Sequence, residues 1–164
     1  MSEPRWLSAS EQDAWVSFAA VLELLPRELD AQLQRDEALT HFDYFCLAML
    51  SEAEDRTLRM TALASMTNAT LPRLSHVVSR LEKRGLVRRE QCAEDARATN
   101  AVMTEEGWAK IQQAAPGHVE NVRSLVFDSL SDEQVGQLHE ISTALLRRLD
   151  PEQRMMASAR SRAS

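Results

Sequence analysis

The sequence predicts a mainly α-helical fold that carries one small β-hairpin. Three observations support this fold class. Apolar residues recur every three or four positions over most of the chain, two short strand-like runs follow one another, and glycine and proline are scarce, at 4 and 5 of 164 residues. An apolar content of 44% is enough for a packed core. We therefore expect one domain, or one domain with a second lobe packed closely against it.

The first predicted helix begins after Ser8, which forms a capping box with Glu11. One face of this helix is apolar, with Trp15, Phe18, Leu22, Leu25, Leu29 and Leu33 at helical spacing. Pro26 interrupts the run and predicts a kink or a short break. Because the helix is too long and too apolar to lie on a small lobe alone, we expect a partner chain to bury it.

Residues 41–70 are predicted to form several short helices, an extended piece and a turn. Residues 41–53 form a helix, residues 58–60 form a short extended piece, and Thr61 caps a brief helix that ends at Met66. Residues 67–69 form a turn, and Thr70 caps the helix that follows.

That next helix has Pro72 in its first turn and ends at Gly85. Its predicted buried residues are Leu74, Val77, Val78 and Leu81. Residues 86–91 and 98–103 read as two strands joined by a charged hairpin tip at 93–97.

Two further helices are expected on the C-terminal side. Thr104 begins the first of them, and Pro116 with Gly117 predicts a kink within it. A second capping box, of Ser131 and Gln134, begins the last helix.

The charge of the chain is distributed unevenly. The net charge is −6, but residues 56–97 carry 9 basic against 4 acidic residues. Residues 1–55 carry 12 acidic against 3 basic, and residues 98–164 carry 9 acidic against 7 basic. A positive middle segment between acidic flanks is typical of a nucleic-acid contact surface.

The predicted elements have the order of a winged helix-turn-helix, which is a helix, a short helix, a turn, a helix and a two-stranded hairpin. The remaining helices would form a helical dimerisation frame. Reading a major groove needs a helix that exposes short polar and basic side chains. The hairpin offers Arg97 at its tip, and Arg88 and Arg89 can contact phosphates. The candidate DNA contacts on the turn and the recognition helix are Asn68, Thr70, Pro72, Arg73, Ser75, His76, Ser79 and Arg80.

Three segments together resemble the MarR family of bacterial transcriptional regulators. They are residues 81–87 (LEKRGLV), 95–97 (DAR) and 103–107 (MTEEG). Met103 replaces the leucine that is usual in the family. Each motif alone is weak, but their joint spacing is specific, and the flanking helices also fall where the family places its dimerisation helices.

The resemblance implies a homodimer, with the first helix and the last two helices of each chain at the interface. We accordingly expect a helical dimerisation region (1–39 and 104–149) and a DNA-binding lobe (40–103). The polar, Ser/Ala/Arg-rich residues 150–164 are expected to form a flexible tail. The resemblance also implies that Arg97 is inserted near a minor groove, and that Asp95 holds this arginine or braces the wing. The alternative for Asp95 is an ordinary turn residue.

The expected function is a transcriptional regulator that binds a pseudo-palindromic operator, as a repressor or, depending on the operator's position, an activator. Half-sites should lie about one helical turn apart, roughly 34–36 Å. Many members of the family bind a small aromatic or phenolic anion between frame and lobe. The residues available for such an effector pocket are Trp15, Phe18, Leu22, His41, Phe42, Phe45, His118 and Arg123. The alternative is that most of them are core residues.

Two other functions remain open at this stage. One is a winged-helix module that binds proteins without DNA, although the recognition helix exposes none of the aromatic residues typical of such a surface. The other is a cysteine-based redox sensor. Cys46 lies on an apolar helix face and reads as core, whereas Cys92 precedes the charged hairpin and is expected to be more exposed.

The sequence shows no feature of an enzyme. It has no glycine-rich phosphate loop and no nucleophile motif, and its four histidines show no metal-ligand spacing. We therefore expect no cofactor and no metal. No apolar run approaches the ~18 residues of a membrane span, and the N-terminal segment does not resemble a signal peptide, so the expected location is cytoplasmic.

Overall fold

The computed structural model describes residues 3–155 of the chain. The helices of this part are α1 (Ala9–Glu37), α2 (His41–Glu52), α3 (Met60–Met66), α4 (Leu71–Lys83), α5 (Glu105–Leu125) and α6 (Asp132–Leu149). The strands are β1 (Thr57–Arg59), β2 (Val87–Gln91) and β3 (Thr99–Met103), and the 3-10 turns are η1 (Glu54–Arg56) and η2 (Phe127–Ser129). The predicted fold class, mainly α with a small β-hairpin, is confirmed.

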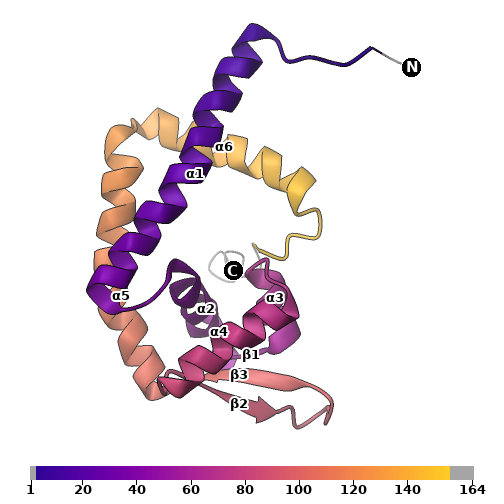
Figure 1. Cartoon of the computed structure of the whole chain (residues 1–164), viewed down its shortest axis with the longest axis vertical. Helices are drawn as coiled ribbons and strands as arrows, with labels where there is room; N and C mark the ends of the chain where they lie inside the picture. The colour runs from indigo at the N-terminus through magenta and orange to yellow at the C-terminus, as the bar shows by residue number, and fades with distance from the viewer. Residues whose placement is uncertain (1–2, 156–164) are drawn as a thin grey trace.

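The elements form two groups in space (Figure 1). Helices α2, α3 and α4 and the small sheet make a winged lobe at one end of the molecule. Helices α1 and α5 lie side by side and rise from this lobe, and α6 turns back toward it from the far end of α5. We call α1, α5 and α6 the helical frame.

Helix starts follow the local sequence closely. Both predicted capping boxes are present: the amide of Glu11 donates to Ser8 Oγ at 3.3 Å, and the amide of Gln134 donates to Ser131 Oγ at 3.3 Å. A side-chain oxygen at this position satisfies one of the amides that a helix leaves unpaired in its first turn. The predicted starts of these two helices are therefore confirmed.

Two predicted local features are wrong. The short break expected at Pro26 is absent, because α1 is a single helix from Ala9 to Glu37 and a proline removes only one amide donor. Helix α3 begins at Met60, and no side chain caps it, so Thr61 is not its cap. The reason is that residues 57–59 pair as a strand, and the helix starts directly where this strand ends.

The sheet has the strand order β1-β3-β2 and is antiparallel throughout. The predicted hairpin of β2 and β3 is confirmed, whereas the sequence showed β1 only as an unpaired extended piece. Ala101 in β3 lies between Leu58 of β1 and Arg89 of β2. Because side chains alternate along a strand, Arg88 and Arg89 point to opposite faces of this sheet.

The hydrophobic core lies inside the winged lobe and at its junction with α5. The residues of α4 that face it are those predicted from periodicity, namely Leu74, Val77, Val78 and Leu81. They pack with Leu47 and Leu50 of α2, and Ile111 of α5 closes the cluster. This packing fixes which side of α4 stays exposed.

The chain beyond α6 turns back toward the winged lobe. Asp150 Oδ2 accepts a hydrogen bond from the amide of Met155 at 2.9 Å, and this segment lines a cavity of about 540 Å³ together with Ser65 and Asn68. The predicted flexible tail covers residues 150–164, of which 156–164 lie outside the described residues. Within residues 3–155, no helix is long and apolar enough to cross a membrane.

Replacing Gly107 should test how closely α5 approaches the sheet. A Cβ at Gly107 would overlap the carbonyl oxygen of Leu86 and stand 3.0 Å from Met103 Cγ. That carbonyl already accepts the amide of Thr104 at 3.1 Å, so it is not free to move. We expect Gly107→Ala to lower the free energy of unfolding by roughly 1–3 kcal/mol in urea titrations.

Gly136 in α6 is the matched control, because nothing lies within 4 Å of the position of its Cβ. Gly136→Ala should leave stability unchanged or raise it by up to about 1 kcal/mol, as expected for alanine in a helix. Equal stability of Gly107→Ala and the unmodified protein would contradict the close approach.

Candidate nucleic-acid interface

Helix α4 follows α3 after a tight turn and forms the second helix of the helix-turn-helix. Asn68 in this turn has φ of 51°, a left-handed conformation that asparagine adopts more readily than most residues. Thr70 caps α4, with its hydroxyl accepting the amide of Arg73 at 3.3 Å. Pro72 lies in the first turn, where its missing amide costs no hydrogen bond.

The side of α4 opposite the core is a narrow polar stripe. Pro72, His76, Ser79 and Lys83 are spaced by four, three and four residues, which places them on one helix face. Pro72, His76 and Lys83 are exposed, and Ser79 is half-buried. Lys83 was not among the sequence candidates, although the same spacing rule would have found it.

The flank of α4 that faces α2 carries two of the candidate arginines. The guanidinium of Arg73 stacks on the ring of Phe42, 4.3 Å from the centroid. Arg80 forms an ion pair with Asp43, whose side chain is only 2% exposed. Both arginines therefore tie α4 to the first turn of α2. With Asp30 they line a groove of about 520 Å³.

The flank of α4 that faces the hairpin is bound by Arg89. Its guanidinium donates to the carbonyl of Ser75 at 2.7 Å and to the hydroxyls of Ser75 and Ser79 at 3.1 and 3.0 Å. The other side of the guanidinium donates to Glu82 Oε2 at 2.8 Å. Arg88, on the opposite sheet face, instead forms an ion pair with Glu90 at 2.5 Å.

The hairpin tip is organised by Asp95. Its Oδ1 accepts the backbone amide of Arg97 at 3.0 Å, so Asp95 stabilises the turn through the main chain of Arg97. The side chain of Arg97 is exposed. It lies beside Arg59, Arg89 and Ser75 along a groove of about 400 Å³ between α4 and the hairpin. Arg59 is a second basic residue that the sequence candidates omitted.

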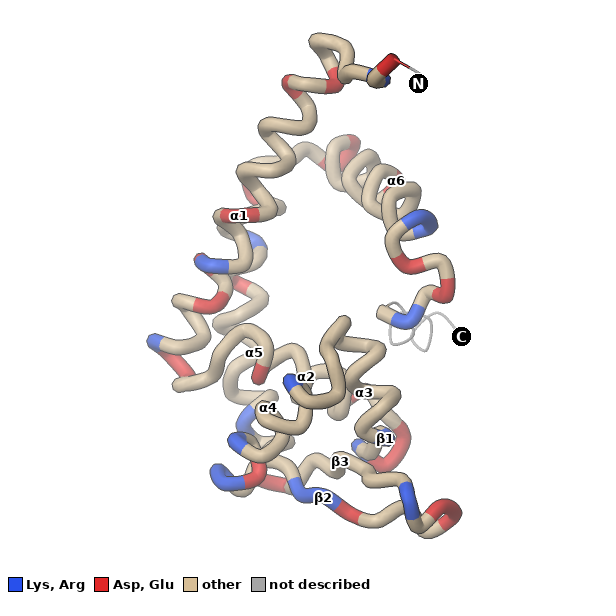
Figure 2. The backbone as a smooth tube through the Cα atoms, turned by 45° about the vertical axis from the view of Figure 1, so that its right-hand side comes forward, with Lys and Arg blue, Asp and Glu red and all other residues tan. Residues whose placement is uncertain are grey.

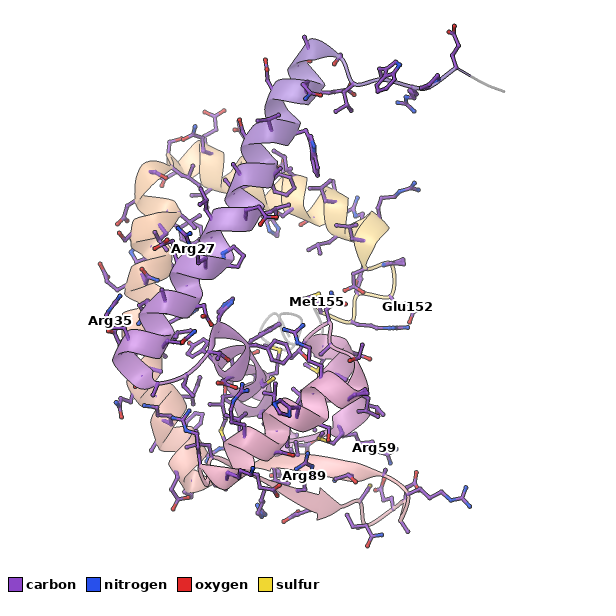
Figure 3. All side chains as sticks on the ribbon, viewed as in Figure 1. Arg27, Arg35, Arg59, Arg89, Glu152 and Met155 are labelled. Carbon is purple, nitrogen blue, oxygen red and sulfur yellow. The ribbon has the colours of Figure 1, made fainter. Side chains whose placement is uncertain are left out.

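The charged residues follow this geometry. Figure 2 shows Lys and Arg along α4 and the hairpin, on the part of the winged lobe farthest from the frame, with acidic residues at the hairpin tip. Figure 3 labels Arg59 and Arg89, which extend from the sheet below α4. The basic residues of the positive segment therefore gather on the winged lobe, with acidic partners between several of them.

A second set of candidates meets at the junction of the frame and the lobe. The rings of His41 and His118 are 5.9 Å apart, and the ring of Tyr44, which the sequence did not suggest, lies 4.3 Å from His118. Burial lowers the pKa of both histidines, and Asp30 partly opposes this for His41.

Three buried polar atoms at this junction have no hydrogen-bond partner among the described residues. They are Gln32 Oε1 in α1 and His118 Nδ1 and Asn121 Nδ2 in α5. Gln32 reaches α5, since a Cβ at Gly117 would lie 3.5 Å from its Nε2. Buried polar groups are normally satisfied by a protein group or an ordered water.

The structure does not bring the other candidate effector residues into this junction. Trp15, Phe18 and Leu22 are 52, 42 and 52% exposed on the first half of α1. Phe42 lies under Arg73, and Phe45 packs against the lobe core. Arg123 is exposed and lies 3.8 Å from Asp128.

The two cysteines have opposite environments. Cys46 is fully buried, as predicted, and burial raises the pKa of its thiol to about 12. Cys92 is 9% exposed against 0% for Cys46, so it is the more exposed of the two as expected, but it is still a buried residue. The backbone amide of Glu94 lowers the pKa of Cys92, and Arg59 Nη2 lies 3.6 Å from its sulfur. Cys92 therefore has the more acidic thiol.

The helix-turn-helix, the hairpin beside it and the basic face that they share define a winged-helix protein. Residues 39–99 match the model of the MarR family. The fold is similar to two MarR-family regulators of Streptomyces coelicolor. Sco3205, solved in complex with DNA, is 47% identical and superimposes with a TM-score of 0.87, over 92% of this chain and 94% of that one. AbsC is 39% identical, with a TM-score of 0.84 over 89% and 98% of the two chains.

A relative of known function supports the same assignment. The transcriptional repressor YetL of Bacillus subtilis is 28% identical over 140 residues, which are 80% of this chain and 83% of YetL. The chain belongs to the MarR family, and it is a transcriptional regulator of that family.

Proposed function

We propose that the protein binds a pseudo-palindromic DNA operator as a homodimer and represses transcription from it. The observation that carries the proposal is the polar stripe of α4, with Arg97 of the hairpin beside it on the same side of the lobe. A helix with this face fits a major groove, and an exposed arginine on a hairpin reaches the neighbouring minor groove. The DNA complex of Sco3205 and the repressor function of YetL support the proposal.

The two elements should contribute to binding in different ways. His76 lies near the start of α4, where base edges come closest, so it should affect specificity. Arg97 lies on the hairpin, where its charge acts on the backbone and the groove width. Arg88 and Arg59 are placed to add charge, which contributes affinity without sequence information.

A competition assay with operator and scrambled duplexes tests this division. His76→Ala should cost roughly 1–3 kcal/mol on the operator and much less on the scrambled duplex. Arg97→Ala should weaken both alike and reduce the salt slope of binding by about one unit between ~50 and ~200 mM salt.

Arg27→Ala is the control, because it removes the same charge from an exposed position on α1. It should leave binding unchanged on both duplexes. If Arg97→Ala lost specificity while His76→Ala weakened all binding equally, the roles of wing and helix would be reversed. If the unmodified protein bound its own upstream DNA no better than scrambled DNA, the proposed function would be wrong.

The frame supplies the argument for a homodimer. No residue of α6 is buried within the single chain, and one face of α6 exposes Leu138, Ile141, Leu145 and Leu149. The first half of α1 exposes a second apolar face with Trp15, Phe18 and Leu22 at helical spacing. Apolar surface of this extent is typical of an interface, and a second copy of the chain presents the matching faces by symmetry.

Sedimentation at low micromolar concentration should give a mass of about twice the 18.5 kDa of one chain. Leu145→Arg should shift the protein toward monomer and weaken operator binding, because it places a charge in the apolar face of α6. Glu140→Arg introduces the same residue on the opposite face of α6 and should stay dimeric. A folded monomer of the unmodified protein would contradict the proposed assembly.

We further propose that a small aromatic or phenolic anion binds at the junction of α1, α2 and α5 and releases DNA. The supporting observation is the set of buried polar atoms without a partner among the described residues on Gln32, His118 and Asn121, of which His118 lies beside the ring of Tyr44. The adjacent first turn of α2 contacts α4 through Asp43 and Phe42. A ligand that favours another position of this turn would shift α4 by its difference in affinity for the two states.

A panel of salicylate-like acids tests this second proposal. A binding acid should raise the melting temperature of the protein and lower its affinity for the operator. His118→Ala should weaken both effects while the protein without ligand still binds DNA. If no acid in the panel raises the melting temperature or releases DNA, this class of effector is excluded.

A further inference from the structure

Arg89 is the residue through which β2 is attached to α4. Its Nη2 donates to three acceptors on α4, the carbonyl and hydroxyl of Ser75 and the hydroxyl of Ser79. Its Nη1 donates to Glu82 Oε2 at 2.8 Å, and its backbone amide donates to Glu82 Oε1 at 2.9 Å. The side chain of Arg89 is 25% exposed. One side chain thus contacts α4 over two turns of the helix.

Glu82 completes this contact because both of its oxygens are used. One carboxylate oxygen holds the main chain of β2, and the other holds the guanidinium. The backbone amide of Arg89 also lowers the pKa of Glu82, because it donates a hydrogen bond to the ionised carboxylate. A guanidinium is planar and its donors are fixed relative to one another, so this arrangement sets an orientation as well as a distance.

The two serines that accept from Arg89 lie on the hairpin side of the stripe. Each hydroxyl uses a lone pair for Arg89 Nη2, which leaves its own proton available to an acceptor outside the protein. Ser79 belongs to the stripe that the proposed function places in the major groove. Arg89 therefore acts on the orientation of a group at the DNA-facing surface, although its own donors point into the protein.

We propose that Arg89 is a positioning residue which, with Glu82, clamps the hairpin to the recognition helix and so fixes the separation of His76 and Arg97 on DNA. This inference rests on the proposed function. It differs from the sequence expectation, in which Arg89 contacts a phosphate. The charge of Arg89 is balanced by Glu82, and binding a phosphate would require breaking contacts that hold the lobe together.

The adjacent Arg88 gives a matched comparison. It carries the same charge one residue earlier in β2, but it faces the other side of the sheet and pairs with Glu90. Loss of Arg88 removes a positive charge without touching the clamp. If Arg89→Ala lowers operator affinity more than Arg88→Ala does, the difference is therefore due to the contacts of Arg89 with α4.

The test measures operator and scrambled-duplex affinity at two salt concentrations for variants of the full chain. Arg89→Ala should lower operator affinity by about tenfold, as for a lost charge-assisted hydrogen bond, with little change on scrambled DNA. The salt slope should not change. Arg88→Ala should change both duplexes by the same factor.

Glu82→Ala separates the clamp from simple electrostatics. Removing an acidic residue near DNA should tighten binding if charge alone matters. The clamp predicts the opposite, a loss on the operator similar to that of Arg89→Ala. The double variant should be no weaker than either single variant, because both remove the same contact.

Arg89→Lys covers the case in which Arg89→Ala does not fold. It keeps the charge, so a phosphate contact predicts nearly unchanged affinity, whereas the clamp predicts a clear loss on the operator since an ammonium cannot span both serines and Glu82. The inference is overturned if Arg89→Ala weakens both duplexes equally with a lower salt slope, or if Glu82→Ala tightens binding.

Failure of the proposed function would look different, because the unmodified protein would then not prefer its operator. In that case the clamp is still tested by unfolding. Arg89→Ala and Glu82→Ala should show a strong coupling in urea unfolding, whereas Arg88→Ala and Glu82→Ala should be additive. Additivity of the first pair would overturn the clamp irrespective of DNA.

Discussion

The ion pair between Asp43 and Arg80 determines how the recognition helix is held. The Asp43 carboxylate is 2% exposed, and Arg80 is its charged partner. A buried carboxylate is costly unless it is paired and hydrogen-bonded, so this contact strongly favours one placement of α4 against α2. The same carboxylate accepts the amide of Thr40 at 2.9 Å and thereby forms the capping box of α2. A single side chain thus begins one helix and orients another.

The helical frame also contacts the start of α2, from the side opposite to α4. Asp30 of α1 accepts the amide of His41 at 2.8 Å, and Lys110 of α5 pairs with Glu37 at 2.7 Å. Arg84, just after α4, donates to the carbonyl of Ala38 at 2.6 Å. The segment 37–43 therefore contacts α1, α4 and α5 at once. A change in the spacing of the frame helices can therefore act on α4 directly, through the first turn of α2.

The basic residues of the winged lobe divide into two roles that their sequence does not reveal. The guanidinium groups of Arg73, Arg80 and Arg89 contact other residues of the lobe, although Arg73 is exposed and the side chain of Arg80 is 42% exposed. Arg97 and Lys83 are exposed and belong to neither of these contacts with α2 and α4. The positive charge of the segment could be read from composition, and the exposed side of α4 from periodicity. Which arginines contact the lobe could not be predicted from the sequence. Their partners lie 7 to 37 positions away in the chain, on other elements or further along the same surface.

The sequence by itself determined the parts of this protein that depend on neighbouring residues. The capping boxes at Ser8 and Ser131, the buried face of α4 and the β2–β3 hairpin follow from hydrogen bonds and spacings within a few positions. Tertiary structure decided the rest: the pairing of β1 with β3, the unbroken course of α1 through Pro26, and the meeting of Tyr44 with His118. The physical reason is that these features arise from packing between segments far apart in the chain, which local propensity does not encode.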